Sequence, residues 1–216
     1  MRPIKKGESS KQYSKYQDAR DDLFKSIGIY CSYCEMIITN MAEVEHIVPR
    51  NKGGEELSWG NFLLSCKYCN TSKSDNNESR EGYLWPDMHN TFVSFIYDRI
   101  NQVIVNNNLT EKEKEYAKNT IELLSLDRHP GKKGWNSHKD MRYISREKAW
   151  KKAIECLNDY IETPIPALAK SISKVASSEG HFSIWMEVFK EHNEVRTLII
   201  TSFVGTNKEY FNDIIA

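Results

Sequence analysis

The chain of 216 residues lacks a membrane-spanning segment, because no apolar run reaches the roughly 18 residues that such a helix needs. It opens on the polar and basic residues Met-Arg-Pro-Ile-Lys-Lys-Gly and lacks the apolar core of a signal peptide there. We therefore expect a cytoplasmic protein with no membrane partner. The formal net charge is zero, since 30 basic residues balance 30 acidic ones. This balance argues against a protein that binds nucleic acid through a basic charge spread over its whole surface.

A nucleotide-binding loop of the form Gly-x-x-x-x-Gly-Lys-Ser/Thr is also missing, so the chain has no ATP switch of that kind. One local excess of positive charge does occur, between Arg128 and Lys152. It is either a solvated helix face with a loop, or a surface that follows phosphates or docks an acidic partner.

Cysteine is scarce, and four of the five cysteines form two Cys-x-x-Cys pairs, Cys31 with Cys34 and Cys66 with Cys69. In a cytoplasmic chain this spacing favours a tetrahedral metal site over disulfides. Four thiolates fill the coordination shell of a structural Zn²⁺ ion, which should therefore hold the fold and do no chemistry. An iron site would use the same ligands, and four unrelated buried thiols are the other alternative. Cys156 is expected as a small core residue.

The composition and the apolar periodicity of the sequence change along the chain and predict three parts. Residues 1–16 are polar and are expected as a flexible N-terminal tail. Residues 17–85 mix short helices and strands with turn residues, and residues 86–216 show mainly helical periodicity. We therefore predict an α+β fold, in which a small module clasped by four cysteines precedes an α-helical region for partner or DNA binding. The individual predictions are strands at 37–38 and 44–48, and helices at 17–28, from about 66, and at 110–126, 139–161, 164–178, 180–192 and 194–203. A helical pattern is also expected from about residue 87, where apolar residues from Phe92 to Ile104 recur at helix spacing.

Between the cysteine pairs lies a set of residues suited to phosphodiester hydrolysis. An imidazole that titrates near neutral pH is a natural base for the attacking water, and His46 supplies one. A divalent ion with oxygen ligands can neutralise the phosphate and assist the leaving oxygen. Glu45 supplies a carboxylate beside His46, and Asn70 supplies an amide oxygen on the facing helix. Adjacent residues of an ideal strand point to opposite faces, so Glu45 and His46 share one site only if the strand is locally distorted.

Each of these residues has a plainer interpretation when it is taken alone. Glu45 could be a surface acid paired with Arg50, and His46 could be a structural histidine. Asn61 and Asn70 could each be a turn or cap residue. Their position together, inside or beside the predicted metal site of Cys31, Cys34, Cys66 and Cys69 (the metal clasp), favours the catalytic interpretation.

The stretch from Cys31 to Lys73, with Glu45-His46-Ile-Val-Pro followed by Asn61 and by Cys66-Lys-Tyr-Cys-Asn70, resembles the zinc-bearing form of the HNH endonuclease family. The resemblance implies a ββα-metal nuclease module. It implies that His46 is the general base, and that Glu45 and Asn70 hold a catalytic Mg²⁺ or Mn²⁺ ion.

The resemblance also assigns the remaining site residues. Asn61 corresponds to the middle asparagine, which braces the loop of the base by hydrogen bonds to the backbone. Lys73 corresponds to a basic residue suited to a phosphate contact, and we predict Arg50 as a second nucleic-acid contact. The family often has aspartate where this chain has Glu45, so the resemblance fixes the reaction class better than the metal geometry.

A looser pattern follows in the helical half, Asp140-Met-Arg142 with Arg146 and Trp150. Together with the opening residues it is most similar to the HNH nuclease subunit (PtuB-like) of Septu antiphage systems and of certain retron defence systems. That resemblance implies an effector nuclease of antiphage defence that cuts DNA and acts in a hetero-oligomer with an ATPase subunit of the SMC/ABC type. The aromatic residues of this half are expected mainly in a core, with a docking face as the alternative. They are Trp150, Phe182, Trp185 and Phe189.

Two other functions compete with the nuclease. In a non-catalytic zinc-ribbon adaptor, the clasp would only hold a loop that binds nucleic acid or a partner protein, and Glu45, His46 and Asn70 would not be needed together. In a redox sensor, the four thiolates themselves would react. In the nuclease, unlike the adaptor, a His46→Ala substitution should abolish cleavage while zinc content and folding stay intact. An air-stable, colourless, zinc-containing protein would argue against the redox sensor.

Overall fold

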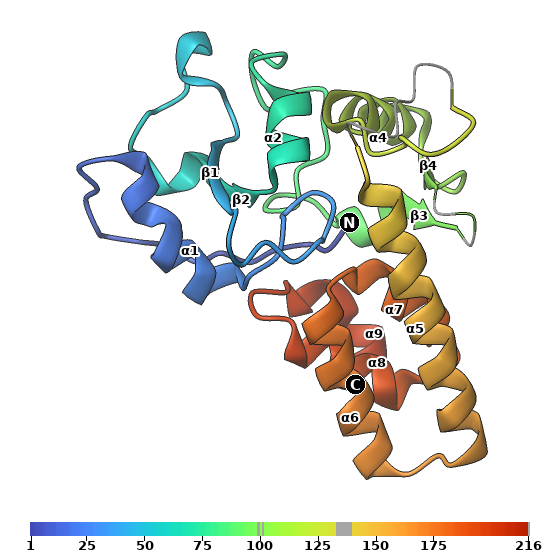
Figure 1. Cartoon of the computed structure of the whole chain (residues 1–216). Coiled ribbons are helices and arrows are strands. Elements are labelled where there is room, and N and C mark those ends of the chain that lie inside the picture. The colour runs from blue at the N-terminus through green and yellow to red at the C-terminus, as the bar shows by residue number, and fades with distance from the viewer. Residues whose placement is uncertain (99, 101, 133–139, 216) are drawn as a thin grey trace.

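The computed structural model of the chain describes residues 1–98, 100, 102–132 and 140–215. Within these ranges, helices combine with two small antiparallel sheets of two strands each (Figure 1), which confirms the α+β class. The elements of the first half are η1 (Tyr16–Ala19), α1 (Arg20–Ile27), β1 (Glu43–His46), η2 (Arg50–Lys52), η3 (Trp59–Asn61), β2 (Phe62–Ser65), α2 (Lys67–Lys73), α3 (Thr91–Ser94), β3 (Phe95–Tyr97) and β4 (Val103–Val105). The elements that follow are α4 (Glu111–Leu124), α5 (Arg142–Glu162), α6 (Pro166–Glu179), α7 (Phe182–Val188), α8 (Asn193–Ser202), η4 (Lys208–Phe211) and α9 (Asn212–Ile215).

Strands β1 and β2 and helix α2 form the predicted ββα unit. β1 and β2 pair antiparallel in a register that places His46 opposite Phe62. The connection between them turns tightly at Gly54, where a Cβ atom would lie 1.9 Å from the carbonyl oxygen of Val48. Only glycine permits so close an approach of two backbone segments. α2 follows β2 after one residue and packs against β1.

β2 is not among the predicted strands, because its sequence Phe-Leu-Leu-Ser is buried at all four positions. A strand buried on both faces shows no alternation of apolar and polar residues, which is the signal by which strands are recognised. The predicted strand at 37–38 is reduced to an isolated bridge between Tyr30 and Ile37. The helical pattern expected between Phe92 and Ile104 is wrong beyond α3, because β3 and β4 pair there, with Phe95 and Tyr97 buried and Ile96 exposed. The capping box of α4 is present as predicted, with the Thr110 hydroxyl accepting from the backbone of Glu113 and the Glu113 carboxylate accepting from that of Thr110.

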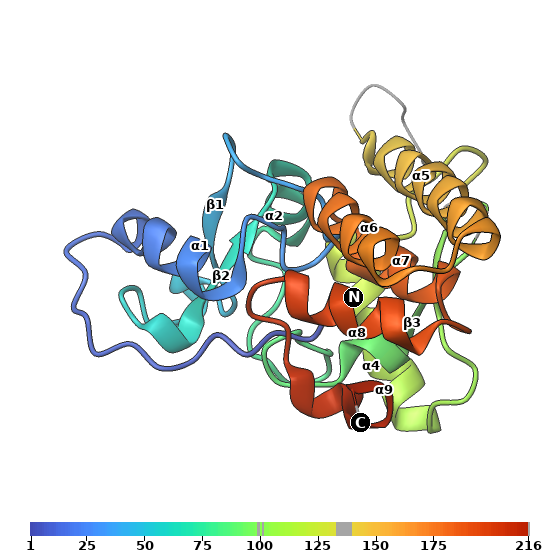
Figure 2. The ribbon, with the colours of Figure 1, turned by 90° about the horizontal axis from the view of Figure 1, so that it is seen from below.

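Two hydrophobic cores stabilise the described part of the chain. The first surrounds the ββα unit and extends past residue 85 to include Phe95 and Leu124. The second lies among α5 to α9, where α6 packs along α8 and α5 along α7 (Figures 1 and 2). Trp185 and Phe189 lie in this second core, so their interpretation as core residues is confirmed. The division of the chain between residues 85 and 86 stays a prediction.

The N-terminal segment differs from the flexible tail predicted for residues 1–16. Residues 1–4 are buried. The Arg2 guanidinium donates to the carbonyl oxygens of Ile27, at 2.7 Å, and Val204, at 2.6 Å. The prediction is wrong for these four residues, because their partners come from distant parts of the chain that the local sequence does not reveal.

The helices of the described ranges include none that combines the length and the apolar character needed to cross a membrane.

Candidate functional site

The two cysteine pairs meet as their spacing predicts. Cys31 and Cys34 lie after α1, while Cys66 is the N-cap of α2 and Cys69 lies in its first turn. The four sulfur atoms are within 4.8 Å of one another, and all four cysteines are buried. A tetrahedral ion with Zn–S bonds near 2.3 Å would hold its sulfurs roughly 3.8 Å apart, so the cluster has the size of a zinc site.

His46, the last residue of β1, is oriented by contacts on several sides. Its Nε2 lies 2.9 Å from the carbonyl oxygen of Glu56. Because a carbonyl oxygen can only accept a hydrogen bond, the proton of the neutral ring belongs on Nε2 and the lone pair on Nδ1. The ring also packs edge-on against Tyr16 and Phe62, with centroid distances of 4.8 and 5.3 Å. The imidazole is thereby held in the tautomer of a base that accepts a proton at Nδ1.

Asn61 braces the loop that orients this histidine. Its side-chain oxygen accepts from the backbone N–H of Val48 at 2.8 Å, and its Nδ2 donates to the carbonyl oxygens of Val48 and Glu55. The amide therefore joins the end of β1 to the residue just before Glu56. Since the Glu56 carbonyl holds Nε2 of His46, the amide of Asn61 fixes the base through the backbone without touching it.

Glu45 lies inside the fold and forms a buried ion pair. Its side chain is 2% exposed, and its Oε1 lies 2.6 Å from Nζ of Lys73, whose side chain is 1% exposed. The hydroxyl of Tyr33 donates to the other carboxylate oxygen. Burial, together with the charge of Glu45 and this hydrogen bond, raises the pKa of Tyr33, so its hydroxyl stays a donor. Lys73 also donates to the backbone carbonyl of His46, at 2.9 Å.

Three of the predicted catalytic residues lie around one cavity of about 490 Å³. Glu45, His46 and Asn70 all contribute to its wall. Asn70 reaches it from α2, and its amide nitrogen donates to the carboxylate of Glu43. The remaining residues around the cavity are Tyr16, Val44, Pro49, Arg50, Asn51 and Ser74. Three consecutive residues of β1, Val44 to His46, thus lie along one cavity, while the side chain of Glu45 itself is 2% exposed and is buried against Lys73.

This arrangement agrees with a comparison against protein families, in which residues 30–76 match the model described as HNH endonuclease. Residues 30–76 form an HNH endonuclease domain. The domain indicates a nuclease. The match covers both cysteine pairs and all the predicted catalytic residues. A comparison with curated proteins finds no match.

The donor atoms of the HNH domain suit a hard divalent ion. Glu45 and Asn70 both line the cavity, and carboxylate and amide oxygens are the donor type that such ions prefer. The Glu45 carboxylate itself is buried against Lys73 and Tyr33. A carboxylate has about four lone-pair sites, and the two partners of Glu45 occupy two of them. Coordination of an ion by Glu45 stays a prediction.

The two predicted nucleic-acid contacts of the HNH domain differ in their surroundings. Arg50 is half-exposed, lines the cavity and pairs with Glu56 at 2.7 Å. The alternative pairing of Glu45 with Arg50 is therefore wrong. Lys73 is buried against Glu45, so its ammonium neutralises that carboxylate in this structure, and a phosphate contact by Lys73 stays a prediction.

The basic strip between Arg128 and Lys152 is not one continuous face. Arg142 and Arg146 are buried, while Arg128, Lys132, Lys148, Lys151 and Lys152 are exposed. Lys133 and Lys139 lie outside the described residues. The spacing of the buried arginines, at the first and second turns of α5, places them on one side of that helix.

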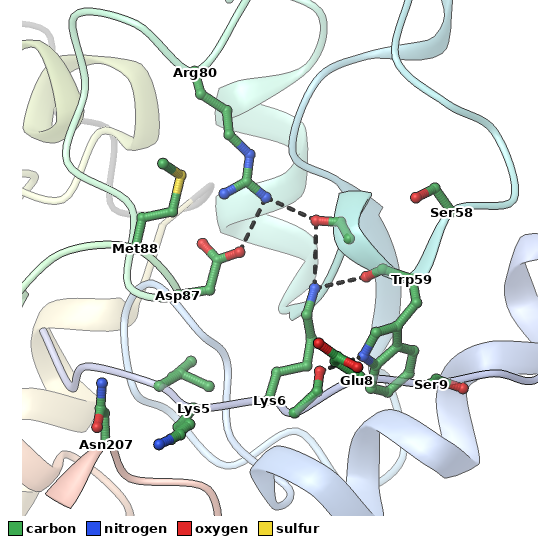
Figure 3. Close-up of a pocket in the computed structure, with 13 residues that line it drawn as sticks. Lys5, Lys6, Glu8, Ser9, Ser58, Trp59, Arg80, Asp87, Met88 and Asn207 are labelled. Atoms are coloured by element: carbon green, nitrogen blue, oxygen red, sulfur yellow. Dashed lines mark hydrogen bonds and ion pairs between the residues drawn. The ribbon is translucent and has the colours of Figure 1, made fainter. Parts of the chain in front are cut away.

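Residues from outside the HNH domain also hold its loop at Trp59 (Figure 3). The Lys6 ammonium donates to the carbonyl oxygens of Trp59, at 2.6 Å, and Phe62, at 2.7 Å. Arg80 donates to the carbonyl of Gly60, at 2.8 Å, and to Asp87. The carbonyls around Asn61 are thus bound by two cations. Burial, with a minor effect of neighbouring charges, lowers the pKa of Lys6 to about 8.

Three residues that shape the site carry no specific signal in the sequence. Tyr16 packs on His46 from a segment predicted to be part of the tail. Tyr33 was visible only as a residue between two cysteines, and Lys6 only as one of several basic residues near the start. Each acts through a contact made by folding, and a lone tyrosine or lysine has no motif that would identify such a contact.

Proposed function

We propose that this protein is a metal-dependent endonuclease that hydrolyses phosphodiester bonds in DNA, with His46 as the general base. The observation that carries the proposal is the orientation of His46 by the Glu56 carbonyl, at one cavity with Glu45 and Asn70. An adaptor that only bound nucleic acid would need neither the fixed tautomer nor the brace by Asn61. The coordination of four thiolates leaves no open position on the clasp, so we assign it a structural Zn²⁺ ion.

We assign each residue of the site a role in the reaction. Nδ1 of His46 accepts a proton from the attacking water, while the Glu56 carbonyl stabilises the protonated ring through Nε2–H. Glu45 and Asn70 would hold a catalytic Mg²⁺ or Mn²⁺ ion. Such an ion, when bound, neutralises charge on the phosphate and on the leaving oxygen. Arg50, half-exposed at the rim, is placed to contact the substrate backbone.

The test is cleavage of plasmid DNA by the purified chain with Mg²⁺ or Mn²⁺. The wild type should cut, and His46→Ala should not, while the zinc content stays the same. The matched control is His129→Ala, which changes a histidine of a loop outside the HNH domain and should cut like the wild type. Equal cutting by wild type and His46→Ala would overturn the assignment of the base. Cutting of RNA but not of DNA would overturn the substrate.

We propose further that the nuclease is the effector of an antiphage defence system and acts with an ATPase subunit of the SMC/ABC type. Two features of the sequence support this role: the looser motif around Asp140 and Arg142, and the missing nucleotide-binding loop, which a partner would supply. Co-purification with the product of a neighbouring ATPase gene, with ATP-dependent control of cleavage, is the expected result. Unchanged cleavage and no association would contradict the partnership.

A further inference from the structure

The buried guanidinium of Arg142 is fully hydrogen-bonded, and one of its partners is a cysteine of the metal clasp. Arg142 is the first residue of α5 and is 1% exposed. Its Nη1 lies 3.0 Å from Sγ of Cys69 and 3.0 Å from the carbonyl oxygen of Leu124. Its Nη2 donates to the carbonyl of Ser125 and to the carboxylate of Asp140, and its Nε donates to the same carboxylate.

These partners account for every donor that an arginine has. A guanidinium carries five N–H groups in a planar fork. Two of them meet Asp140, two meet the last carbonyls of α4 at Leu124 and Ser125, and one meets Cys69. A lysine would supply the charge, but its single ammonium could not donate to Asp140, to the two carbonyls and to Cys69 at once. The position therefore requires the geometry of arginine as well as its charge.

The charge of the clasp explains why a cation belongs there. Four thiolates around one divalent cation leave a net negative charge, and all four cysteines are buried. Burying uncompensated charge is unfavourable, and a hydrogen bond from a cation to the thiolate offsets it. Arg142 is placed to do this, since it reaches Cys69 from outside the HNH domain.

We propose that Arg142 is a positioning residue of the metal clasp, which donates a charge-assisted hydrogen bond to the Cys69 thiolate and ties the clasp to the C-terminal end of α4 and the N-terminal end of α5. Metal binding at the clasp and order at these two helix ends then depend on each other. The proposal concerns the clasp alone and does not depend on the proposed nuclease activity.

The first test replaces Arg142 with methionine and measures the clasp directly. Loss of an outer partner of a metal ligand typically weakens metal affinity about 10–100-fold, so zinc should pass to a competing chelator at a correspondingly lower chelator concentration. In the Co²⁺-substituted protein, the sulfur-to-metal charge-transfer band should move to longer wavelength, because the thiolate loses a donor and a positive charge. Arg142→Lys should restore part of both effects. Unchanged affinity with an unshifted band would overturn the proposal.

A matched control separates this role from a general loss of stability. Leu126→Ala removes a buried apolar side chain just after α4, which has no hydrogen bond or charge to offer a cysteine. It should destabilise the fold and leave the cobalt band in place. A shift in Leu126→Ala as large as that in Arg142→Met would contradict a specific role for the guanidinium.

A second test uses the wild type alone and so remains available if the variants do not fold. Zinc is removed with a chelator, and hydrogen exchange is followed along the chain. Exchange should rise at residues 140–146 as well as at residues 31–36. Protection that persists at 140–146 while 31–36 opens would refute the link.

Discussion

Replacing Lys73 with methionine should destabilise the protein by about 3–5 kcal/mol, the range observed when one partner of a buried ion pair is removed. Lys73 and Glu45 are 1% and 2% exposed, and their charged atoms are 2.6 Å apart. Methionine fills a similar volume but leaves the Glu45 carboxylate buried with Tyr33 as its remaining partner. The penalty is the burial of an uncompensated charge, and it should appear as a lower free energy of unfolding.

The double variant Glu45→Gln/Lys73→Met makes the prediction specific. It removes both charges, so it should lose less than the sum of the two single variants, and the difference is the interaction between the partners. Urea unfolding of the zinc-loaded protein, followed by circular dichroism at constant pH, measures all four forms. A loss below about 1 kcal/mol for Lys73→Met, a value typical of exposed pairs, would refute a buried pair. Additive single effects would refute the coupling.

The single variant Lys73→Met also tests Glu45 as a proposed metal ligand. If Glu45 holds a divalent ion, Mn²⁺ can neutralise the carboxylate that Lys73→Met leaves unpaired. Saturating Mn²⁺ should then raise the unfolding free energy of Lys73→Met more than that of the wild type, because a ligand stabilises a fold according to its affinity. An equal effect on both proteins would count against Glu45 as a ligand.

Three further predictions concern the loop brace, the clasp and a buried histidine. Asn61→Ala should reduce the cleavage rate constant about 100-fold with unchanged zinc content, since a small displacement of a catalytic group has that effect; a normal rate would contradict the brace. Removing zinc should unfold the clasp and abolish cleavage even with Mn²⁺ present, which circular dichroism and a plasmid assay would measure, and full activity of the zinc-free protein would contradict this. Burial, followed by the charge of Arg146, lowers the pKa of His181 from 6.5 to about 3, so the unfolded state binds a proton that the folded state does not. The contribution of neutral His181 to the free energy of unfolding should therefore be fully present above pH 6.5 and should be lost as the pH falls from 6.5 toward 3. His181→Gln should flatten this fall in urea titrations, and an unchanged slope would contradict the shift.

Local chemistry made much of the HNH domain, and the start of one helix outside it, predictable from the sequence. The Cys-x-x-Cys spacing predicted which sulfurs would meet, and the capping box at Thr110 predicted the start of α4. The sequence around Glu45 and His46 predicted a strand, which the structure has at Glu43–His46. Each of these signals lies within a few neighbouring residues, so it can be recognised without the three-dimensional structure.

Contacts between distant segments account for what the sequence did not predict. The burial of residues 1–4 depends on carbonyls more than 20 residues away in one case and about 200 in another. The pairing of Lys73 with Glu45 depends on how α2 packs against β1. The sequence marks Arg142 as part of the Asp140-Met-Arg142 pattern and of the basic strip, but only the fold reveals that it contacts Cys69.

The central claim is that His46 acts as the general base of a nuclease, and chemical rescue tests it most directly. His46→Gly removes the imidazole and leaves space for a free one, so the variant should be inactive on plasmid DNA with Mn²⁺. Added imidazole should then restore cleavage in a saturable manner, and it should not restore cleavage in Asn70→Ala. Cleavage by His46→Gly at the wild-type rate without imidazole would contradict the account.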